Sequence, residues 1–206
     1  RWRQVEAKKG TYTYPEKYQR FIDEAARVGL EPFLIPGHKN EVYDGDWDPL
    51  GLPKDSKTQK ALGRYLGEVA TRYSGLVNAI EVWNEPNAFW HSAIEPWENP
   101  ELMAEVLKST YPLIKKVAPE TTVVGGALAW SFFKDGDPRK YAKKMFAAGA
   151  LEGMDALSIH PYRRQWTPES PVQNGKEVGT FRTQIERWQD LTAKYNDGEA
   201  LPIWAD

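Results

Sequence analysis

The stretch AIEVWNEPN, residues 79–87, decides the fold of this chain because it joins a short strand to a polar turn. Its first five residues are mostly apolar, which is typical of a strand that is covered on both faces. Asn84, Glu85 and Pro86 then end the strand. In parallel barrels, polar residues that directly follow a strand build the active site. The stretch therefore predicts a parallel sheet with a functional edge.

Strands and helices alternate along the rest of the chain. Apolar runs bounded by turn residues predict further strands at residues 31–37, 121–126, 155–160 and 201–206. Helix start signals lie between them, at Tyr14-Pro15, Ser56, Asn99-Pro100 and Asp137-Pro138. A last apolar stripe runs from Phe181 to Tyr195. This alternation predicts a parallel sheet covered by helices.

Two architectures fit such an alternation, the doubly wound open sheet and the (β/α)8 TIM barrel. A doubly wound nucleotide-binding sheet carries a glycine-rich phosphate turn after an early strand. Gly125 and Gly126 lie inside a predicted strand instead, and the sequence has no G-x-G-x-x-G or P-loop pattern. The barrel is therefore the favoured fold.

The length of the chain is short for a closed barrel. Residues 31–201 hold four strand–helix units of roughly 42 residues, so eight units would need on the order of 340 residues. If residues 1–2 are the tail of a preceding strand, the 206 residues hold about strands 2 to 7. We expect residues 1–206 to be a partial TIM-barrel catalytic domain, and a fragment, because the chain stops inside a predicted core strand.

The composition excludes several classes of protein. With 27 Lys and Arg against 29 Asp and Glu, the net charge is −2, whereas nucleic-acid-binding proteins carry a basic excess. We therefore expect no nucleic-acid partner. No apolar stretch is long enough to span a bilayer, so we expect no membrane partner either. The absence of Cys excludes disulfides and a thiolate nucleophile. Nine Trp predict either a large core or a groove that stacks flat ligands.

Three stretches carry a resemblance to a known group of enzymes. IEVWNEPN (residues 80–87) resembles the fourth-strand signature of glycoside hydrolase clan A, the retaining β-glycosidases built on (β/α)8 barrels. WRQVE (2–6) with GTY (10–12) resembles the segment after the second strand, and SIHPY (158–162) resembles the end of the sixth. Within the clan, the pattern is most similar to family 39 and related bacterial polysaccharide hydrolases, over essentially the whole chain.

The resemblance implies that Glu85 is the general acid/base and that Asn84 binds the sugar 2-hydroxyl. Retaining hydrolysis needs two carboxyl groups about 5–5.5 Å apart, one to protonate the leaving oxygen and one to attack the anomeric carbon. Apolar surroundings and a neighbouring carboxylate would raise the pKa of Glu85 and suit it to the first role. The alternative is that Glu85 is only an acid at a helix start, where the helix dipole favours it.

The nucleophile implied by the resemblance is a Glu at the end of the seventh strand. Aligning PIWAD (202–206) to that pattern places Asp206 one residue before it. We therefore expect the nucleophile immediately after Asp206, and we expect the 206 residues alone to be inactive. Asp206 itself is an alternative nucleophile, with a shorter side chain.

Other residues after predicted strands are implied to contact the sugar. By resemblance, His160 and Tyr162 would line the site near the nucleophile; the alternative for Tyr162 is a loop-packing aromatic. His38 and Asn40 would offer hydrogen bonds from the third-strand loop. Aromatic side chains in these loops can stack on a pyranose, and the candidates are Trp83, Trp90 and Trp166.

Two further hypotheses remain open. One is a non-catalytic carbohydrate-binding or assembly fragment, which lacks the nucleophile and pairs with the remainder of its own barrel. The other is a metal-dependent barrel hydrolase that uses His38, His91 and His160, although no H-x-H or H-E-x-x-H pair is present. The glycosidase mechanism needs no cofactor and no metal, and its partner is a carbohydrate. The family's usual setting implies an extracellular or periplasmic location.

Overall fold

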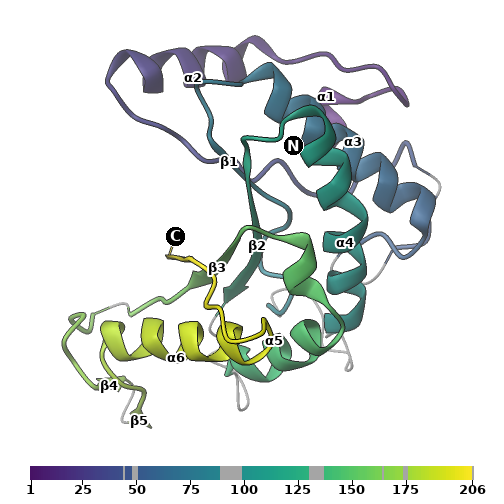
Figure 1. The fold of residues 1–206 in the computed structure, drawn as a ribbon. Coiled ribbons are helices and arrows are strands. Elements are labelled where there is room, and N and C mark those ends of the chain that lie inside the picture. Colours follow the sequence, from purple (N-terminus) through teal and green to yellow (C-terminus); the bar gives the residue numbers. More distant parts are fainter. Residues whose placement is uncertain are drawn as a thin grey trace.

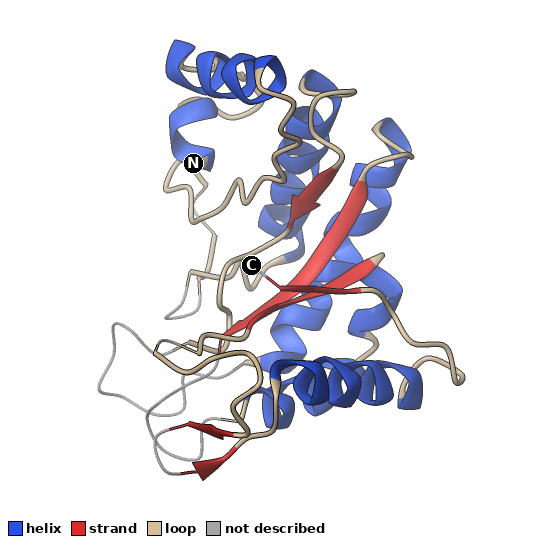
Figure 2. Cartoon of the chain, turned by 90° about the vertical axis from the view of Figure 1, so that its left-hand side faces the viewer, coloured by secondary structure: helices blue, strands red, loops and turns tan. Residues whose placement is uncertain are grey.

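The computed structural model describes residues 1–43, 45–47, 51–88, 99–129, 137–163, 165–173 and 176–205. The described residues include a four-stranded parallel sheet, in which each strand pairs with the next along the chain. Its strands are β1 (Ala79–Glu81), β2 (Thr122–Ala129), β3 (Ala156–His160) and β6 (Ile203–Ala205). They curve along the inside of a crescent, and the helices lie on its outside (Figures 1 and 2). This partial α/β barrel confirms the predicted fold class.

The helices follow the predicted order, with one short addition. They are α2 (Glu16–Arg27), α3 (Ser56–Arg72), α4 (Pro100–Val117), α5 (Pro138–Ala147) and α6 (Phe181–Lys194), with the 3-10 turn η1 (Ala150–Gly153) after α5. Asn99 and Asp137 cap α4 and α5 through side-chain oxygens that accept hydrogen bonds from backbone N–H groups. The cap of α3 is Asp55 and not Ser56, because Asp55 Oδ1 accepts from Thr58 N at 2.9 Å.

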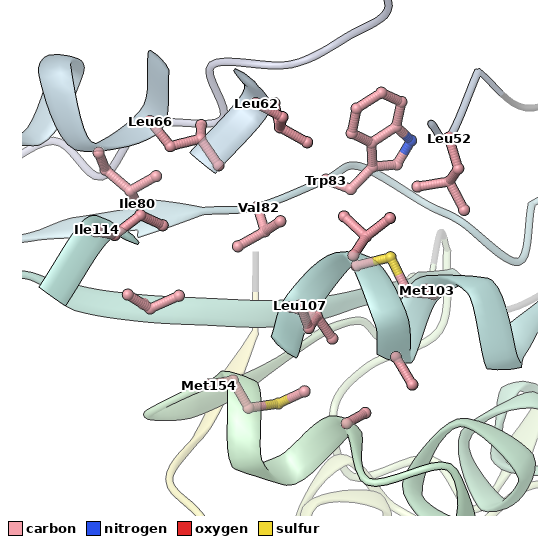
Figure 3. Close-up of a cluster of buried hydrophobic side chains, with 14 of the residues drawn as sticks. Leu52, Leu62, Leu66, Ile80, Val82, Trp83, Met103, Leu107, Ile114 and Met154 are labelled. Atoms are coloured by element: carbon pink, nitrogen blue, oxygen red, sulfur yellow. The ribbon is translucent and has the colours of Figure 1, made fainter. Parts of the chain in front are cut away.

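The main core lies between the sheet and helices α3 and α4. Apolar side chains from β1 and its C-terminal extension meet side chains from both helices there (Figure 3). Ile80, Leu66 and Ile114 are fully buried. Gly63 of α3 permits this packing, because a Cβ at this position would lie 2.9 Å from Leu113 Cδ1. The core therefore fixes β1, and with it the turn that follows β1.

Two predicted strands differ in the structure. Residues 1–5 are not the tail of a strand: Trp2–Val5 forms helix α1, closed by a hydrogen bond from Glu6 N to Trp2 O. Residues 31–37 contribute only an isolated parallel bridge between Leu34 and Ile80. Pro32 and Pro36 lack an N–H group, so this segment can form few ladder hydrogen bonds. Within the expected partial barrel, the described residues thus have a helix at residues 2–5 and a single bridge at residues 31–37.

A short pair of strands was also not predicted. Strands β4 (Val172–Gln173) and β5 (Lys176–Glu177) form a short antiparallel pair in the connection between β3 and α6. This pair lies on the side of the molecule toward which the parallel strands run (Figures 1 and 2). The connection is therefore placed at the functional edge of the sheet.

Candidate active site

Glu85 lies in a turn that leaves the C-terminal end of β1. Its backbone has a φ of +49°, in the left-handed region that non-glycine residues rarely adopt. Its N–H donates a 3.1 Å hydrogen bond to the carbonyl of Ala127, which is itself left-handed with a φ of +45°. Such backbone conformations persist where the surrounding structure enforces them, and they cluster at functional sites.

The Ala127 carbonyl that accepts this hydrogen bond lies in a bulge of β2. The register between β2 and β3 shifts between Gly125 and Leu128, and Gly126 has a φ of +96°. A Cβ on Gly126 would lie 2.6 Å from Leu157 Cδ1 and 2.9 Å from the carbonyl oxygen of Ser158. Only glycine fits this position, so the bulge depends on Gly126, and the bulge in turn presents the Ala127 carbonyl to Glu85.

Asn87 fastens the same turn to β2 a second time. Its buried side chain donates from Nδ2 to the Ala129 carbonyl at 2.8 Å and accepts at Oδ1 from Ala129 N at 3.0 Å. The amide thus imitates a neighbouring strand at the point where β1 has ended. This role was not predicted from the sequence, although Asn87 stands in the quoted motif.

The side chain of Glu85 contacts His160, at the end of β3. Glu85 Oε1 lies 2.7 Å from His160 Nδ1, and the two side chains are only 13% and 4% exposed. At this distance a single proton lies between the atoms: either Nδ1–H donates to the carboxylate, or the protonated carboxyl donates to Nδ1. Tyr162 Oη lies 3.3 Å from the same nitrogen. Three predicted site residues therefore meet in one partly buried cluster.

The structure places other predicted residues around this cluster. Asn84 is half-buried directly before Glu85. The rings of His38 and Trp83 form a T-shaped pair, with centroids 5.6 Å apart. Burial lowers the pKa of His38, and the positive charge of Arg1 lowers it further. Trp166 is half-buried in the connection after β3. Trp90, His91 and Asp206 lie outside the described residues.

Two predicted sugar contacts are corrected by the structure. Trp83 is 1% exposed and belongs to the core cluster, so its indole offers no face to a ligand. Asn40 is fully buried: its Nδ2 donates to the carbonyl of Glu6 at 2.9 Å, and its Oδ1 accepts from Val42 N at 3.2 Å. Both side chains hold the structure together and do not line the site.

A buried carboxylate that was not predicted anchors the N-terminal segment. Glu6 is fully buried and accepts hydrogen bonds from Trp2 Nε1 at 2.5 Å, Tyr43 Oη at 2.5 Å and Gly10 N at 2.6 Å. These bonds tie residues 2–10 to the segment that follows His38. The one sequence signal for this role is the spacing of four residues between Trp2 and Glu6, which places two side chains on the same face of a helix.

In the described part of the chain, no group of three or more His, Asp or Glu side chains is arranged to hold a metal ion. Nor does any described helix combine the length and apolar character needed to cross a bilayer.

Comparison with known proteins gives matches among solved structures. No protein-family model and no curated protein matches the sequence. A family 39 glycoside hydrolase from Bacteroides cellulosilyticus WH2 superposes over 99% of this chain with a TM-score of 0.80 and 24% identity. Xylanase 10B from Thermotoga petrophila RKU-1, in complex with xylobiose, matches 93% with a TM-score of 0.58 and 12% identity. Endo-glycoceramidase II from Rhodococcus sp. matches 98% with a TM-score of 0.57 and 16% identity.

This chain spans 41% of the length of the family 39 structure, and 55% and 54% of the lengths of the other two. At these identities the likeness concerns the fold. The chain therefore has the fold of part of a TIM-barrel glycoside hydrolase, as the resemblance in its sequence implied.

Proposed function

We propose that this chain supplies the general acid/base half of a retaining β-glycoside hydrolase that cleaves an oligo- or polysaccharide. The contact between Glu85 and His160 carries the proposal, because it holds a proton between a carboxyl group and an imidazole at the C-terminal ends of parallel strands. The structural neighbours support it, since their names describe glycosidases and one of them holds xylobiose.

In the proposed first step, Glu85 gives its proton to the glycosidic oxygen while a carboxylate attacks the anomeric carbon. The leaving sugar departs as an alcohol, and a glycosyl ester remains. Glu85, now a carboxylate, then takes a proton from water, whose oxygen displaces the ester carboxylate. Asn84 is proposed to hydrogen-bond the sugar 2-hydroxyl, and Tyr162 and His160 to line the sugar site.

We place the attacking carboxylate on a Glu that follows Asp206 in the natural protein. Strand β6 pairs in parallel with β3, and Ala205 lies opposite Ile159. The C-terminal end of β6 therefore lies at the same edge of the sheet as His160, the last residue of β3. This register supports a nucleophile there, within reach of a sugar bound at Glu85.

The decisive experiment compares Glu85→Gln with the wild type in the natural full-length protein. We expect a loss of roughly 10²–10⁴ in kcat/KM on an oligosaccharide, whose leaving group needs the proton. The loss should be smaller for a 4-nitrophenyl β-glycoside, because that leaving group departs without protonation. Glu101→Gln, at an exposed position in the first turn of α4, is the matched control.

Other outcomes would select another function. Equal rates for Glu85→Gln and wild type would refute the acid/base role. Binding of oligosaccharides with no hydrolysis by the full-length wild type would favour a carbohydrate-binding protein. Loss of hydrolysis on treatment with a chelator would favour a metal-dependent hydrolase.

A further inference from the structure

The connection between β3 and α6 runs through residues 161–180 and begins directly after His160. In barrels, the loops that follow the strands build the active site. Tyr162, at its start, is 45% exposed and reaches His160 Nδ1. We call the described residues 161–163, 165–173 and 176–180 the β3–α6 loop.

One buried cation holds this loop together. Arg163 is only 8% exposed, and three of its nitrogens donate to three separate backbone carbonyls. Nε donates to Thr167 O at 3.0 Å, Nη1 donates to Gly179 O at 3.2 Å, and Nη2 donates to Ser170 O. Thr167 and Ser170 lie in the first part of the loop and Gly179 lies near its end, so the guanidinium links the two parts. Among the described residues, no carboxylate forms an ion pair with Arg163.

The backbone of the loop is closed in the same way. Phe181 N donates to Pro168 O at 2.7 Å, and Gly179 N donates to Pro171 O at 3.0 Å. Trp166 N donates to Arg163 O at 3.0 Å, which closes a backbone turn between these two residues. Backbone hydrogen bonds within the chain therefore hold the loop in addition to the bonds of Arg163.

The chemistry of arginine explains why this residue stands here. Its guanidinium is a rigid planar fork with five N–H donors, whereas a lysine ammonium is a single point. A lysine at this position would keep the charge but could not reach carbonyls in both parts of the loop at once. Burying a cation is costly, and among the described residues backbone carbonyls, rather than a carboxylate, compensate the charge of Arg163.

We propose that Arg163 is a positioning residue that keeps the β3–α6 loop preformed as one wall of the glycan site. On this wall, Tyr162 lies beside the sugar unit at Glu85, and Trp166 recognises a sugar unit beyond it. A preformed wall spares the ligand the entropy cost of ordering the loop. This inference rests on the proposed function and adds to it a determinant of oligosaccharide recognition.

The test uses Arg163→Lys and Arg163→Gln in the natural full-length protein. Arg187→Gln is the matched control, because Arg187 donates only one hydrogen bond to the same loop, from Nη1 to Val178 O at 2.9 Å. Hydrolysis is measured on 4-nitrophenyl β-glycosides, which fill little beyond the cleaved unit, and on a β-linked pentasaccharide of the same sugar. Backbone hydrogen exchange is followed over residues 165–173 and 176–180.

We expect both Arg163 variants to raise KM for the pentasaccharide about tenfold, with kcat and the 4-nitrophenyl reaction nearly unchanged. Exchange in the loop should become faster in both variants, and Arg187→Gln should resemble wild type. An equal loss on both substrates, or rescue by lysine, would overturn the proposal. So would an unchanged KM for the pentasaccharide.

The inference and the proposed function can fail separately. If wild type hydrolyses no glycoside, the proposed function fails and the recognition role falls with it. Hydrogen exchange still decides whether Arg163 holds the loop, because that measurement needs no activity. If wild type hydrolyses both substrates but loop exchange is unchanged in the variants, only the Arg163 inference fails.

Discussion

Glu85 Oε1 and His160 Nδ1 lie 2.7 Å apart although β2 separates their strands in the sheet. The contact forms at the level where β2 bulges at Gly126 and where the Ala127 carbonyl accepts from Glu85 N. The bulge, the turn after β1 and the end of β3 therefore form one unit around the acid.

Removing the imidazole should weaken the acid without unfolding the protein. His160→Ala takes away the group that shares a proton with Glu85, and we expect kcat/KM on an oligosaccharide to fall about 10–100-fold. Tyr162→Phe, which removes only the more distant hydroxyl, should lose less. Steady-state kinetics of the full-length protein measure both, and a greater loss for Tyr162→Phe would reverse the roles given to the two side chains.

Asn87→Ala should destabilise the protein by about 2–4 kcal/mol, because it leaves the N–H and carbonyl of Ala129 buried without their partner. Chemical denaturation measures this change in the free energy of unfolding. The control is Asn78→Ala, which removes an exposed hydrogen bond from Nδ2 to Glu31 Oε2 and should cost less than about 1 kcal/mol. Equal costs would mean that the two buried hydrogen bonds between Asn87 and Ala129 contribute no more to stability than one exposed hydrogen bond.

Gly126→Ala should cost more than Gly198→Ala. Both glycines have a positive φ, +96° and +92°, so both substitutions strain the backbone. A Cβ at Gly198 meets nothing within 4 Å, whereas one at Gly126 meets Leu157 and the Ser158 carbonyl. The difference in unfolding free energy isolates the steric cost, which we expect to be about 1–3 kcal/mol. No difference would show that the bulge can relax.

Acid should destabilise the opposite end of the sheet through Asp155. Burial opposes its ionisation, but hydrogen bonds from Val123 N, Lys115 Nζ and Tyr111 Oη outweigh burial and hold the pKa of Asp155 below its usual value. A carboxyl with a lowered folded-state pKa stabilises the protein above its unfolded pKa, near 3.9, and this stability is lost as the pH falls through the folded value.

Asp155→Asn should therefore flatten the acid side of the stability curve. Denaturation at pH 7 and at successively lower pH measures the slope for wild type and variant. If the two slopes agree below pH 4, Asp155 does not contribute to acid sensitivity.

The features that the sequence predicted correctly are those that depend on residues close together in the chain. The turn after β1, the caps at Asn99 and Asp137 and the apolar stripes of the long helices each depend on neighbouring residues. The bulge at Gly126 and the hydrogen bonds between Asn87 and Ala129 depend on how separate segments align, and no spacing within one segment specifies that alignment.

The errors have a similar cause. Trp83 follows a strand, as a ligand-stacking residue would, but its direction is set by packing against α3 and Leu52, which the sequence order does not reveal (Figure 3). Asn40 is polar and stands in a loop, yet its partner is the backbone of Glu6, far away in the chain. Position after a strand predicts proximity to the site and does not predict orientation.

The close contact between Glu85 and His160 also affects how a pH–rate profile should be interpreted. Two groups that share a proton at this distance ionise as a coupled system, which passes through doubly, singly and unprotonated forms. The limb of a pH–rate profile at which this pair loses its proton would then report a macroscopic constant of the pair. Replacing His160 would shift that limb although Glu85 is unchanged, so the limb cannot be assigned to Glu85 by its value alone.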